Sequence, residues 1–481
     1  QEGFGEILPG AQVFVIDEAH QLPELAAQFF GEGLSARPLV EMAREALSEA
    51  KSVTGAAMVV QGPARVLEEA TRGLRMALDP LPPRGTRERA LHDDVAWDAL
   101  GALDDALVQF GAALEGLREA SPGFDALHAR AVEHRARLLR WAPPGFAQRN
   151  EDPDAPATAT LPVVDPAGGD AGEGAAGAAA TPAPSARGRK PAPVDVRWYE
   201  LSPRGFRLQR TPLDVSGPLR THREQSRAAW VFTSATLAVD GRFDHLAQRL
   251  GLDAPRTLIA PSPFDWARQA LCYLPPRMPE PQSRDYTDAV VDAVRPVLEA
   301  SGGRAFLLFA SHRALREAAE CLRDGPWPLF VQGEAPRAVL LQRFRDSGNG
   351  VLLGAASFRE GVDVAGDALS VVVIDKLPFA APDDPVFEAR LDAIRREGGN
   401  PFRDEQLPQA VIALKQGVGR LIRTVGDRGV LVLCDPRLTT KAYGRVFMDS
   451  LPPFTRTRAL EDVRAFFALP DGIADLPTDT P

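Results

Sequence analysis

Apolar and polar positions follow two patterns along the chain, and the second half shows the simpler one. Short, wholly apolar runs, typical of strands buried on both faces of a parallel sheet, alternate there with segments whose apolar residues recur at helical spacing. The expected strands are Ala305–Phe309, Leu329–Val331, Gly350–Leu353, Leu369–Ile374 and Gly429–Leu433. The expected helices are Asp285–Ala300, Arg313–Leu322, Arg337–Arg345 and Leu407–Arg423. This alternation predicts an α/β fold with a doubly wound parallel sheet.

The first half begins with a strand and then changes character. Residues 11–20 read as a short buried strand that ends in carboxylates, and residues 230–233 read as a second strand. Between them, residues 31–150 are rich in Ala, Leu, Glu and Arg, which predicts an all-helical insertion. Its helical spacing is clear at Leu67, Ala70, Leu74 and Leu78. A hairpin at residues 196–208 is expected to return the chain to the sheet.

Residues 151–192 contain Ala, Gly, Pro, Asp and Thr with almost no large apolar side chain, so we expect a disordered loop. The whole chain then divides into segments of different character. The predicted domains are the C-terminal part of a first parallel-sheet domain at 1–30, the helical insertion at 31–150, the loop at 151–192, a return to the first domain at 193–255, a second parallel-sheet domain at 256–470 and a flexible tail at 471–481.

Composition narrows the class of protein. The chain has 481 residues, 44% of them apolar, which suffices for two or more domains of a soluble protein. A net charge of −10 excludes a simple polybasic nucleic-acid binder, so any anion-binding groove must be local and built from arginine. The widely spaced Cys272, Cys321 and Cys434 predict a reducing cytoplasm and no metal cluster. The sequence has no apolar run of membrane-spanning length and no signal peptide, so no membrane association is expected.

The first candidate for chemistry is Asp17-Glu18-Ala19-His20, which directly follows the first strand. In nucleoside triphosphatases, one carboxylate at such a position holds Mg²⁺ and the next orients the attacking water. Two adjacent acids on a turn are also common surface chemistry. The apolar strand before them favours the catalytic interpretation.

Hydroxyl groups follow other strands. The segment Thr233-Ser234-Ala235-Thr236 can bridge a catalytic carboxylate or histidine to a neighbouring domain, although a helix N-cap also explains Ser and Thr. Ser311 and His312 begin an expected helix whose N-terminus suits a phosphate, and a plain cap is an equal alternative.

Two loops after expected strands have the composition of ligand-binding edges. In residues 357–364, Gly361 and Asp363 permit close backbone approach to nucleic acid or to another domain, and a simple turn is equally consistent. Residues 375–379 combine polar and apolar side chains, and either a ligand or core packing explains them.

The segment Gln416–Arg423 ends the last expected helix. Arg420 and Arg423 are three residues apart and would therefore share one helix face, where paired guanidinium groups suit a phosphate. The alternative is a solvated basic turn at a helix C-terminus.

Taken in order, the DEAH, TSAT, SFREGVD and QGVGRLIR segments resemble the later motifs of superfamily 2 helicases. The details are similar to the DinG/YoaA branch, relatives of the XPD-type helicases, through residues 4–9, Ser262-Pro263-Phe264-Asp265, Gln332-Gly333, Leu377-Pro378-Phe379 and Asp384-Pro385. The resemblance covers nearly the whole chain. It implies two RecA-like motor domains that clamp ATP while single-stranded DNA crosses them in 5′ to 3′ translocation. The helical insertion matches the family's arch domain.

The resemblance also implies roles for single residues. Asp17 would hold Mg²⁺ and Glu18 would activate water. The residues that would couple the ATP site to DNA are His20, Ser234, Thr236, Gly361 and Asp363. Those that would meet ATP from the second motor domain are Gln416, Gly419, Arg420 and Arg423. The candidates for DNA contact are Ser311, His312, Gln332 and Arg359, the last at a position where relatives often carry an aromatic residue.

Two features of the family are absent from the sequence: a phosphate-binding loop of the form GxxxxGK[ST], and the cysteines of a 4Fe–4S cluster. We expect both to lie upstream, so the chain is interpreted as a C-terminal fragment that lacks about two hundred residues and is inactive alone.

The predicted function is that of an ATP-dependent DNA helicase of repair or replication, which uses ATP and Mg²⁺. Its expected partners are single-stranded DNA, forked duplex DNA and a replication or repair protein. The alternative is a non-hydrolysing RecA-like protein that binds DNA or a partner and has lost its phosphate loop.

Overall fold

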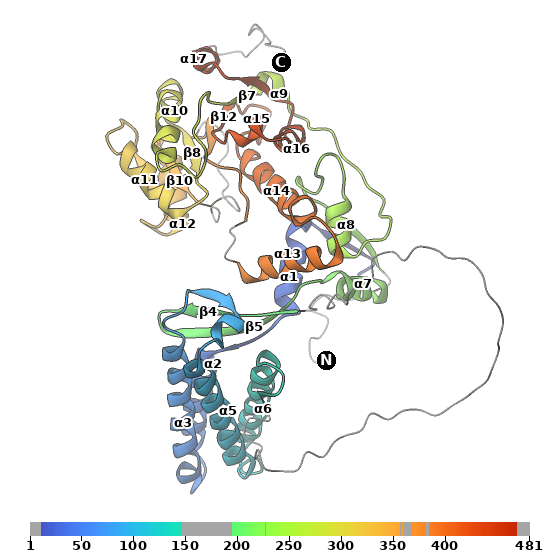
Figure 1. Cartoon of the computed structure of the whole chain (residues 1–481), viewed down its shortest axis with the longest axis vertical. Helices are drawn as coiled ribbons and strands as arrows, with labels where there is room; N and C mark the ends of the chain where they lie inside the picture. The colour runs from blue at the N-terminus through green and yellow to red at the C-terminus, as the bar shows by residue number, and fades with distance from the viewer. Residues whose placement is uncertain are drawn as a thin grey trace, which may run out of the picture. The chain divides into compact units, whose positions relative to one another are not determined.

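The computed structural model describes residues 11–146, 195–226, 228–355, 358, 368–380 and 384–468 (Figure 1). The expected disordered loop at 151–192 and the expected tail at 471–481 lie outside these residues. The chain forms two compact units. We call them the parallel-sheet unit, made of Gln1–Ala26, Asp214–Pro382 and Gly399–Pro481, and the helical unit, made of Ala27–Leu213 and Asp383–Gly398.

The parallel-sheet unit is built on a seven-stranded sheet of order β13-β7-β12-β11-β8-β10-β9 in which every neighbouring pair is parallel. The strands are β7 (Ala270–Tyr273), β8 (Ala305–Leu308), β9 (Leu329–Val331), β10 (Val351–Gly354), β11 (Val371–Ile374), β12 (Gly429–Leu433) and β13 (Thr455–Thr457). The predicted doubly wound parallel sheet is confirmed. Its central strands are apolar throughout because helices cover both faces and leave no solvated side.

Alternate residues of each strand enter two different cores. Phe306 and Leu308 pack in one core, and Ala305 and Leu307 pack in the other. The helices on the Phe306 face are α12 (Arg337–Ser347), α14 (Leu407–Val418) and α16 (Gly444–Ser450). Those on the Ala305 face are α10 (Tyr286–Ser301), α11 (His312–Leu322) and α17 (Leu460–Ala468). The carboxyl ends of the strands therefore meet at one edge, where loops can carry a site.

The same unit contains a separate parallel pair, β1 (Val13–Ile16) and β6 (Ala229–Phe232). The rings of Phe14 and Trp230 lie 4.6 Å apart on one face of this pair. On the other face, Val13 and Val15 are 54% and 65% exposed, so the expectation of a buried first strand is wrong for that face. Among the described strands, β6 alone pairs with β1. Short helices accompany the pair, namely η1 (Ala19–Gln21), α1 (Leu22–Phe29), α7 (Ser216–Gln225) and α8 (Asp244–Leu250).

The helical unit contains four long helices that run alongside one another (Figure 1). They are α2 (Ala36–Glu49), α3 (Ala56–Ala77), α5 (Asp94–Glu115) and α6 (Pro122–Trp141). The helical spacing in the sequence gives the buried face correctly. Leu67, Leu74 and Leu78 are at most 1% exposed, and they share a core with Leu103, Leu107 and Phe110.

The insertion is not all-helical, so that prediction is wrong. Residues 31–150 contain two strands, β2 (Glu32–Ser35) and β3 (Arg84–Thr86). These strands join β4 (Asp195–Ser202) and β5 (Gly205–Pro212) in a four-stranded antiparallel sheet of order β2-β5-β4-β3. The predicted hairpin, β4–β5, exists, but it lies in the helical unit rather than in the parallel sheet because Tyr199, Phe206 and Leu208 complete the helical core. Helix α13 (Pro385–Glu397), which comes from the second half of the chain, packs against β3 and β4.

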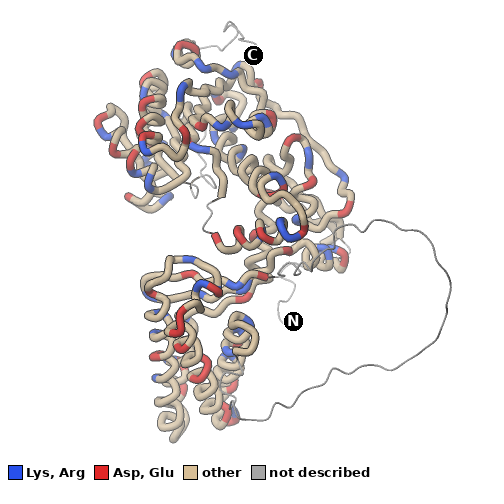
Figure 2. The backbone as a smooth tube through the Cα atoms, viewed as in Figure 1, with Lys and Arg blue, Asp and Glu red and all other residues tan. Residues whose placement is uncertain are grey.

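Charged residues occur along both units. Basic and acidic residues are interspersed along each of them (Figure 2). Many form pairs one helical turn apart, such as Arg37–Glu41 and Arg65–Glu69, which are exposed and contribute little to stability. Within the part of the chain that the structure describes, no helix is both long enough and apolar enough to cross a membrane.

Candidate functional site

The carboxyl ends of β1 and β6 bring the two motifs from the first half of the chain together. The backbone pairing continues beyond the strands, because Thr233 N donates to Ile16 O at 2.9 Å and Ala19 N donates to Thr233 O at 3.1 Å. Residues 17–20 therefore lie beside residues 234–236, although more than two hundred positions separate them in the sequence.

His20 is the centre of this site. Its Nδ1 lies 3.1 Å from Ser234 Oγ, 3.3 Å from Thr236 Oγ1 and 3.3 Å from Glu18 Oε2. Ser234 Oγ also donates to Glu18 Oε2 at 2.7 Å and accepts from Thr236 N at 3.2 Å. The imidazole, two hydroxyls and one carboxylate thus form a single hydrogen-bonded network.

The network continues into α14. Gln416 Nε2 lies 2.5 Å from His20 Nε2. One arrangement of protons satisfies all these contacts: Gln416 donates to Nε2, and the neutral imidazole carries its proton on Nδ1, facing Ser234 and Glu18. His20 therefore joins three elements of the parallel-sheet unit that are distant in the sequence.

Glu18 adopts a strained backbone conformation. Its φ of 50° and ψ of 40° lie in the left-handed region, which costs a non-glycine residue about 1 kcal/mol or more. Its carboxylate makes no capping bond to η1 and instead meets Ser234 and His20, while its side chain is 58% exposed. Strain of this kind concentrates at functional sites, where the surrounding structure holds a side chain in a fixed direction.

Asp17 is exposed beside this network and fits the part expected of a Mg²⁺ ligand. The described residues contain no group of three or more His, Cys, Asp or Glu side chains that could hold a metal, and the role of Asp17 as a Mg²⁺ ligand stays a prediction.

The two arginines do not lie on one face of a helix, so that expectation is wrong. Helix α14 ends at Val418, and both Arg420 and Arg423 follow it in a turn. Glycines weaken the end of the helix, and the Asp427 carboxylate then captures the chain by accepting from the backbone N–H groups of Arg423 and Thr424, each at 2.7 Å.

Arg420 and Arg423 are both partly buried. Burial lowers the pKa of the Arg423 guanidinium, and the nearby Asp427 carboxylate opposes that shift. Gly419, the residue between Gln416 and these arginines, is exposed at the end of the helix and has helical backbone angles. The segment is therefore a turn fixed by Asp427 rather than an extension of the helix.

The residues expected to contact DNA lie after strands of the seven-stranded sheet. Ser311 Oγ accepts from Ala314 N at 3.1 Å, so the residue is a helix cap, as the alternative held, while Ser311 and His312 are both exposed at the N-terminus of α11. Gln332 Oε1 accepts from Ala355 N at 2.7 Å and joins the ends of β9 and β10. Arg359, Gly361 and Asp363 lie outside the described residues.

One residue at this edge gave only a weak signal in the sequence. Asp375 follows β11 and is 2% exposed. Its Oδ1 accepts from Ala310 N at 2.9 Å and from Lys376 N at 2.6 Å, while Oδ2 has no hydrogen-bond partner. Burial raises the pKa of Asp375 to about 7, against the opposing effect of Lys376. A carboxylate directly after a wholly apolar strand was the available signal, and the sequence alone did not show that it is buried.

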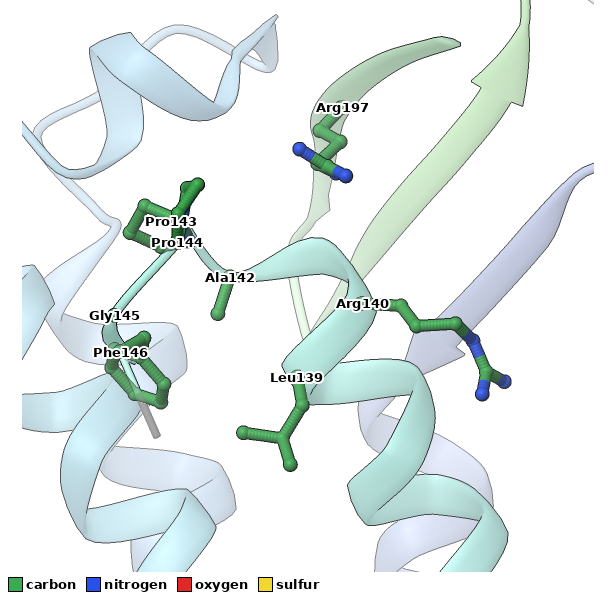
Figure 3. Close-up of a pocket in the computed structure, with 8 residues that line it drawn as sticks. All are labelled: Leu139, Arg140, Ala142, Pro143, Pro144, Gly145, Phe146 and Arg197. Atoms are coloured by element: carbon green, nitrogen blue, oxygen red, sulfur yellow. The ribbon is translucent and has the colours of Figure 1, made fainter. Parts of the chain in front are cut away.

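The helical unit has a cavity of about 250 Å³ between the end of α6 and β4 (Figure 3). Its lining residues are Leu139, Arg140, Ala142, Pro143, Pro144, Gly145, Phe146 and Arg197. Arg140 turns away from the loop at residues 142–146 and bonds Glu32, whereas Arg197 lies 3.7 Å from Asp195, which is already bonded to Arg210. None of these residues belongs to the site around His20.

Known proteins resemble this chain over part or nearly all of its length. The helicase C-terminal domain family matches residues 294–454. The ATP-dependent DNA helicase YoaA of Escherichia coli (strain K12) is 37% identical over 475 residues, which are 98% of this chain and 67% of that protein. The ATP-dependent helicase DinG of Mycobacterium tuberculosis (strain ATCC 25618 / H37Rv) is 39% identical over 282 residues, or 56% of this chain and 42% of that protein.

A solved structure described as apo XPD has a TM-score of 0.50 at 12% identity and covers 94% of this chain and 78% of its own. At that identity it supports the fold alone. The parallel sheets and the joined DEAH and Ser-Ala-Thr segments define a RecA-like helicase motor. The chain belongs to the DinG/YoaA family of ATP-dependent DNA helicases. It spans about two thirds of the length of the YoaA proteins it matches, at 67% and 66%.

Proposed function

We propose that the whole protein couples ATP hydrolysis to 5′ to 3′ translocation on single-stranded DNA and unwinds forked duplexes in repair or replication. The observation that carries this proposal is the bonding of His20 to Glu18, Ser234 and Gln416. A motor must link its hydrolytic carboxylate to a second moving element, and one imidazole makes that link here.

At the hydrolytic end, Asp17 holds Mg²⁺ and Glu18 orients water and accepts its proton. Bound Mg²⁺ supplies charge neutralisation on the phosphates. Ser234 and His20 hold the Glu18 carboxylate through bonds to Oε2, which leaves the other oxygen available for water. The strained backbone at Glu18 supports this interpretation, because it directs the carboxylate into the network instead of toward a helix cap.

On the other side of the network, Gln416, Gly419, Arg420 and Arg423 meet the nucleotide. The arginines neutralise charge that develops on the transferred phosphoryl group. They lie in a turn whose backbone is held by Asp427 rather than by helical bonds, and this turn would set where the guanidinium groups meet the nucleotide. Gly361 and Asp363 complete the link to DNA.

Single-stranded DNA crosses the carboxyl edge of the seven-stranded sheet. Ser311 and His312, exposed at the N-terminus of α11, present backbone N–H groups to a phosphate, and Gln332 and Arg359 contact the same strand. The expected 4Fe–4S cluster stays a prediction about the whole protein, and iron analysis of that protein tests it.

The experiment uses the whole protein with ATP and Mg²⁺ on duplexes that carry either a 5′ or a 3′ single-stranded tail. The proposal predicts unwinding of the 5′-tailed and forked substrates, with little unwinding of the 3′-tailed duplex. Unwinding of the 3′-tailed substrate alone would reverse the polarity. DNA binding without any hydrolysis would favour the alternative, a non-hydrolysing RecA-like protein.

A further inference from the structure

Helix α14 makes two adjacent contacts with segments that follow β1 and β6. Gln416 meets His20, and the neighbouring Lys415 donates from Nζ to the carbonyl oxygen of Ala238 at 3.0 Å. Ala238 lies two residues beyond Thr236, on the segment that supplies the hydroxyls of the site. One turn of α14 is therefore attached both to the His20 network and to the segment that follows its hydroxyls.

The two contacts leave the helix in different directions. Successive side chains of an α-helix are rotated by about 100°, because 3.6 residues complete a turn. Buried residues of α14 such as Val411 and Leu414 already fix its rotation on the seven-stranded sheet. A single bond would still let the segments that follow β1 and β6 pivot against the helix, whereas contacts at two adjacent positions fix their orientation and distance relative to it.

The Lys415 ammonium group is held by the backbone. Among the described residues it forms no ion pair, and its hydrogen bond goes to a backbone carbonyl, as does that of Lys376. Burial lowers the pKa of its ammonium group, and no carboxylate opposes that shift. A partly buried cation is costly without a carboxylate partner, whereas a charge-assisted bond to a carbonyl is stronger than a neutral one.

We infer that Lys415 is a positioning residue, which fixes the orientation of the Ala238 segment relative to α14 and thereby sets where the following arginine turn meets the nucleotide. The inference rests on the proposed function. In the part of the chain that the structure describes, the side chain of Lys415 bonds Ala238 and not a residue of the His20 network. We therefore expect it to act on the coupling of hydrolysis to DNA and not on the binding of ATP.

The test compares Lys415→Met with Lys441→Met in the whole protein. Lys441 is an exposed lysine of the same unit with no side-chain contact in the described structure, so it controls for loss of one positive charge. For Lys415→Met we expect the DNA-stimulated kcat for ATP hydrolysis and the base pairs unwound per ATP each to fall about tenfold. The KM for ATP should stay within about twofold, and Lys441→Met should match the wild type.

A third variant keeps the test decisive if Lys415→Met lowers the melting temperature. Lys415→Arg retains a charged donor, and the inference predicts a kcat within about threefold of the wild type. Equal values for Lys415→Met and Lys441→Met would overturn the inference, as would a tenfold loss in Lys415→Arg at the wild-type melting temperature. Failure of the wild-type protein to hydrolyse ATP in the presence of DNA would instead refute the proposed function.

Discussion

Asp375→Asn tests the environment of the carboxyl edge of the seven-stranded sheet. Asparagine keeps the oxygen that accepts from Ala310 N and Lys376 N, and it cannot ionise. The pKa of Asp375 rises from 3.8 in the unfolded chain to about 7 in the folded one because the carboxyl group is buried. An acid with a raised pKa holds its proton more tightly in the folded state.

In the wild type, the contribution of Asp375 to the free energy of unfolding is therefore largest below pH 3.8 and declines as the pH rises toward 7. Each pKa unit corresponds to about 1.4 kcal/mol, so the free energy of unfolding should lose about 2 kcal/mol from this group between pH 5 and pH 7. Above pH 7 the carboxyl group is ionised in both states, and the loss levels off.

The assay is urea unfolding of the wild type and the variant at pH 5, 6, 7 and 8, with the folded fraction measured by circular dichroism. The free energy of unfolding of Asp375→Asn minus that of the wild type should rise by about 2 kcal/mol from pH 5 to pH 7 and then level off. Asp346→Asn, an exposed carboxyl on α12, is the matched control for the substitution. If the difference in free energy of unfolding between variant and wild type is the same at every pH, burial does not hold the proton on Asp375.

Three further changes test other parts of the structure. Arg420→Ala should reduce ATP hydrolysis about a thousandfold while single-stranded DNA affinity is largely kept, as measured by steady-state kinetics and fluorescence anisotropy; lost DNA binding with intact hydrolysis would reverse its assignment. Gln416→Leu removes the bond to His20 and should lower DNA-stimulated hydrolysis about tenfold, with unstimulated hydrolysis as the reference; an unchanged ratio would show that the bond does not couple the two. Phe110→Ala, at a site 0% exposed, should cost the helical unit about 3–5 kcal/mol in denaturant unfolding, and a loss below 1 kcal/mol would mean that the core collapses around the gap.

The parallel sheet could be predicted from sequence because its strands are apolar on both faces. Runs such as residues 371–374 have no other common interpretation when helical segments lie on either side. The two motifs that meet at His20 were also predictable, since each directly follows a strand. The distances between His20 and its hydrogen-bond partners could not be predicted, because they depend on how the fold places residues that are far apart in the sequence.

The antiparallel sheet of the helical unit shows why other parts were missed. Strand β2 has the sequence Glu-Gly-Leu-Ser, with one large apolar side chain, Leu34, and no alternation that would reveal a strand. The end of α14 was misplaced for a related reason. Nothing local to residues 419–423 ends the helix strongly, and the chain turns because Asp427, several residues later, binds the backbone of Arg423 and Thr424.

We propose that Glu18 orients the water that attacks ATP, within a network that His20 joins to α14. This role can be tested by ATP hydrolysis of the whole protein with saturating single-stranded DNA, for the wild type, Glu18→Gln and the surface control Glu320→Gln. We expect Glu18→Gln to bind ATP but to hydrolyse it at least about a hundredfold more slowly, while Glu320→Gln matches the wild type. Hydrolysis by Glu18→Gln at the wild-type rate would contradict it.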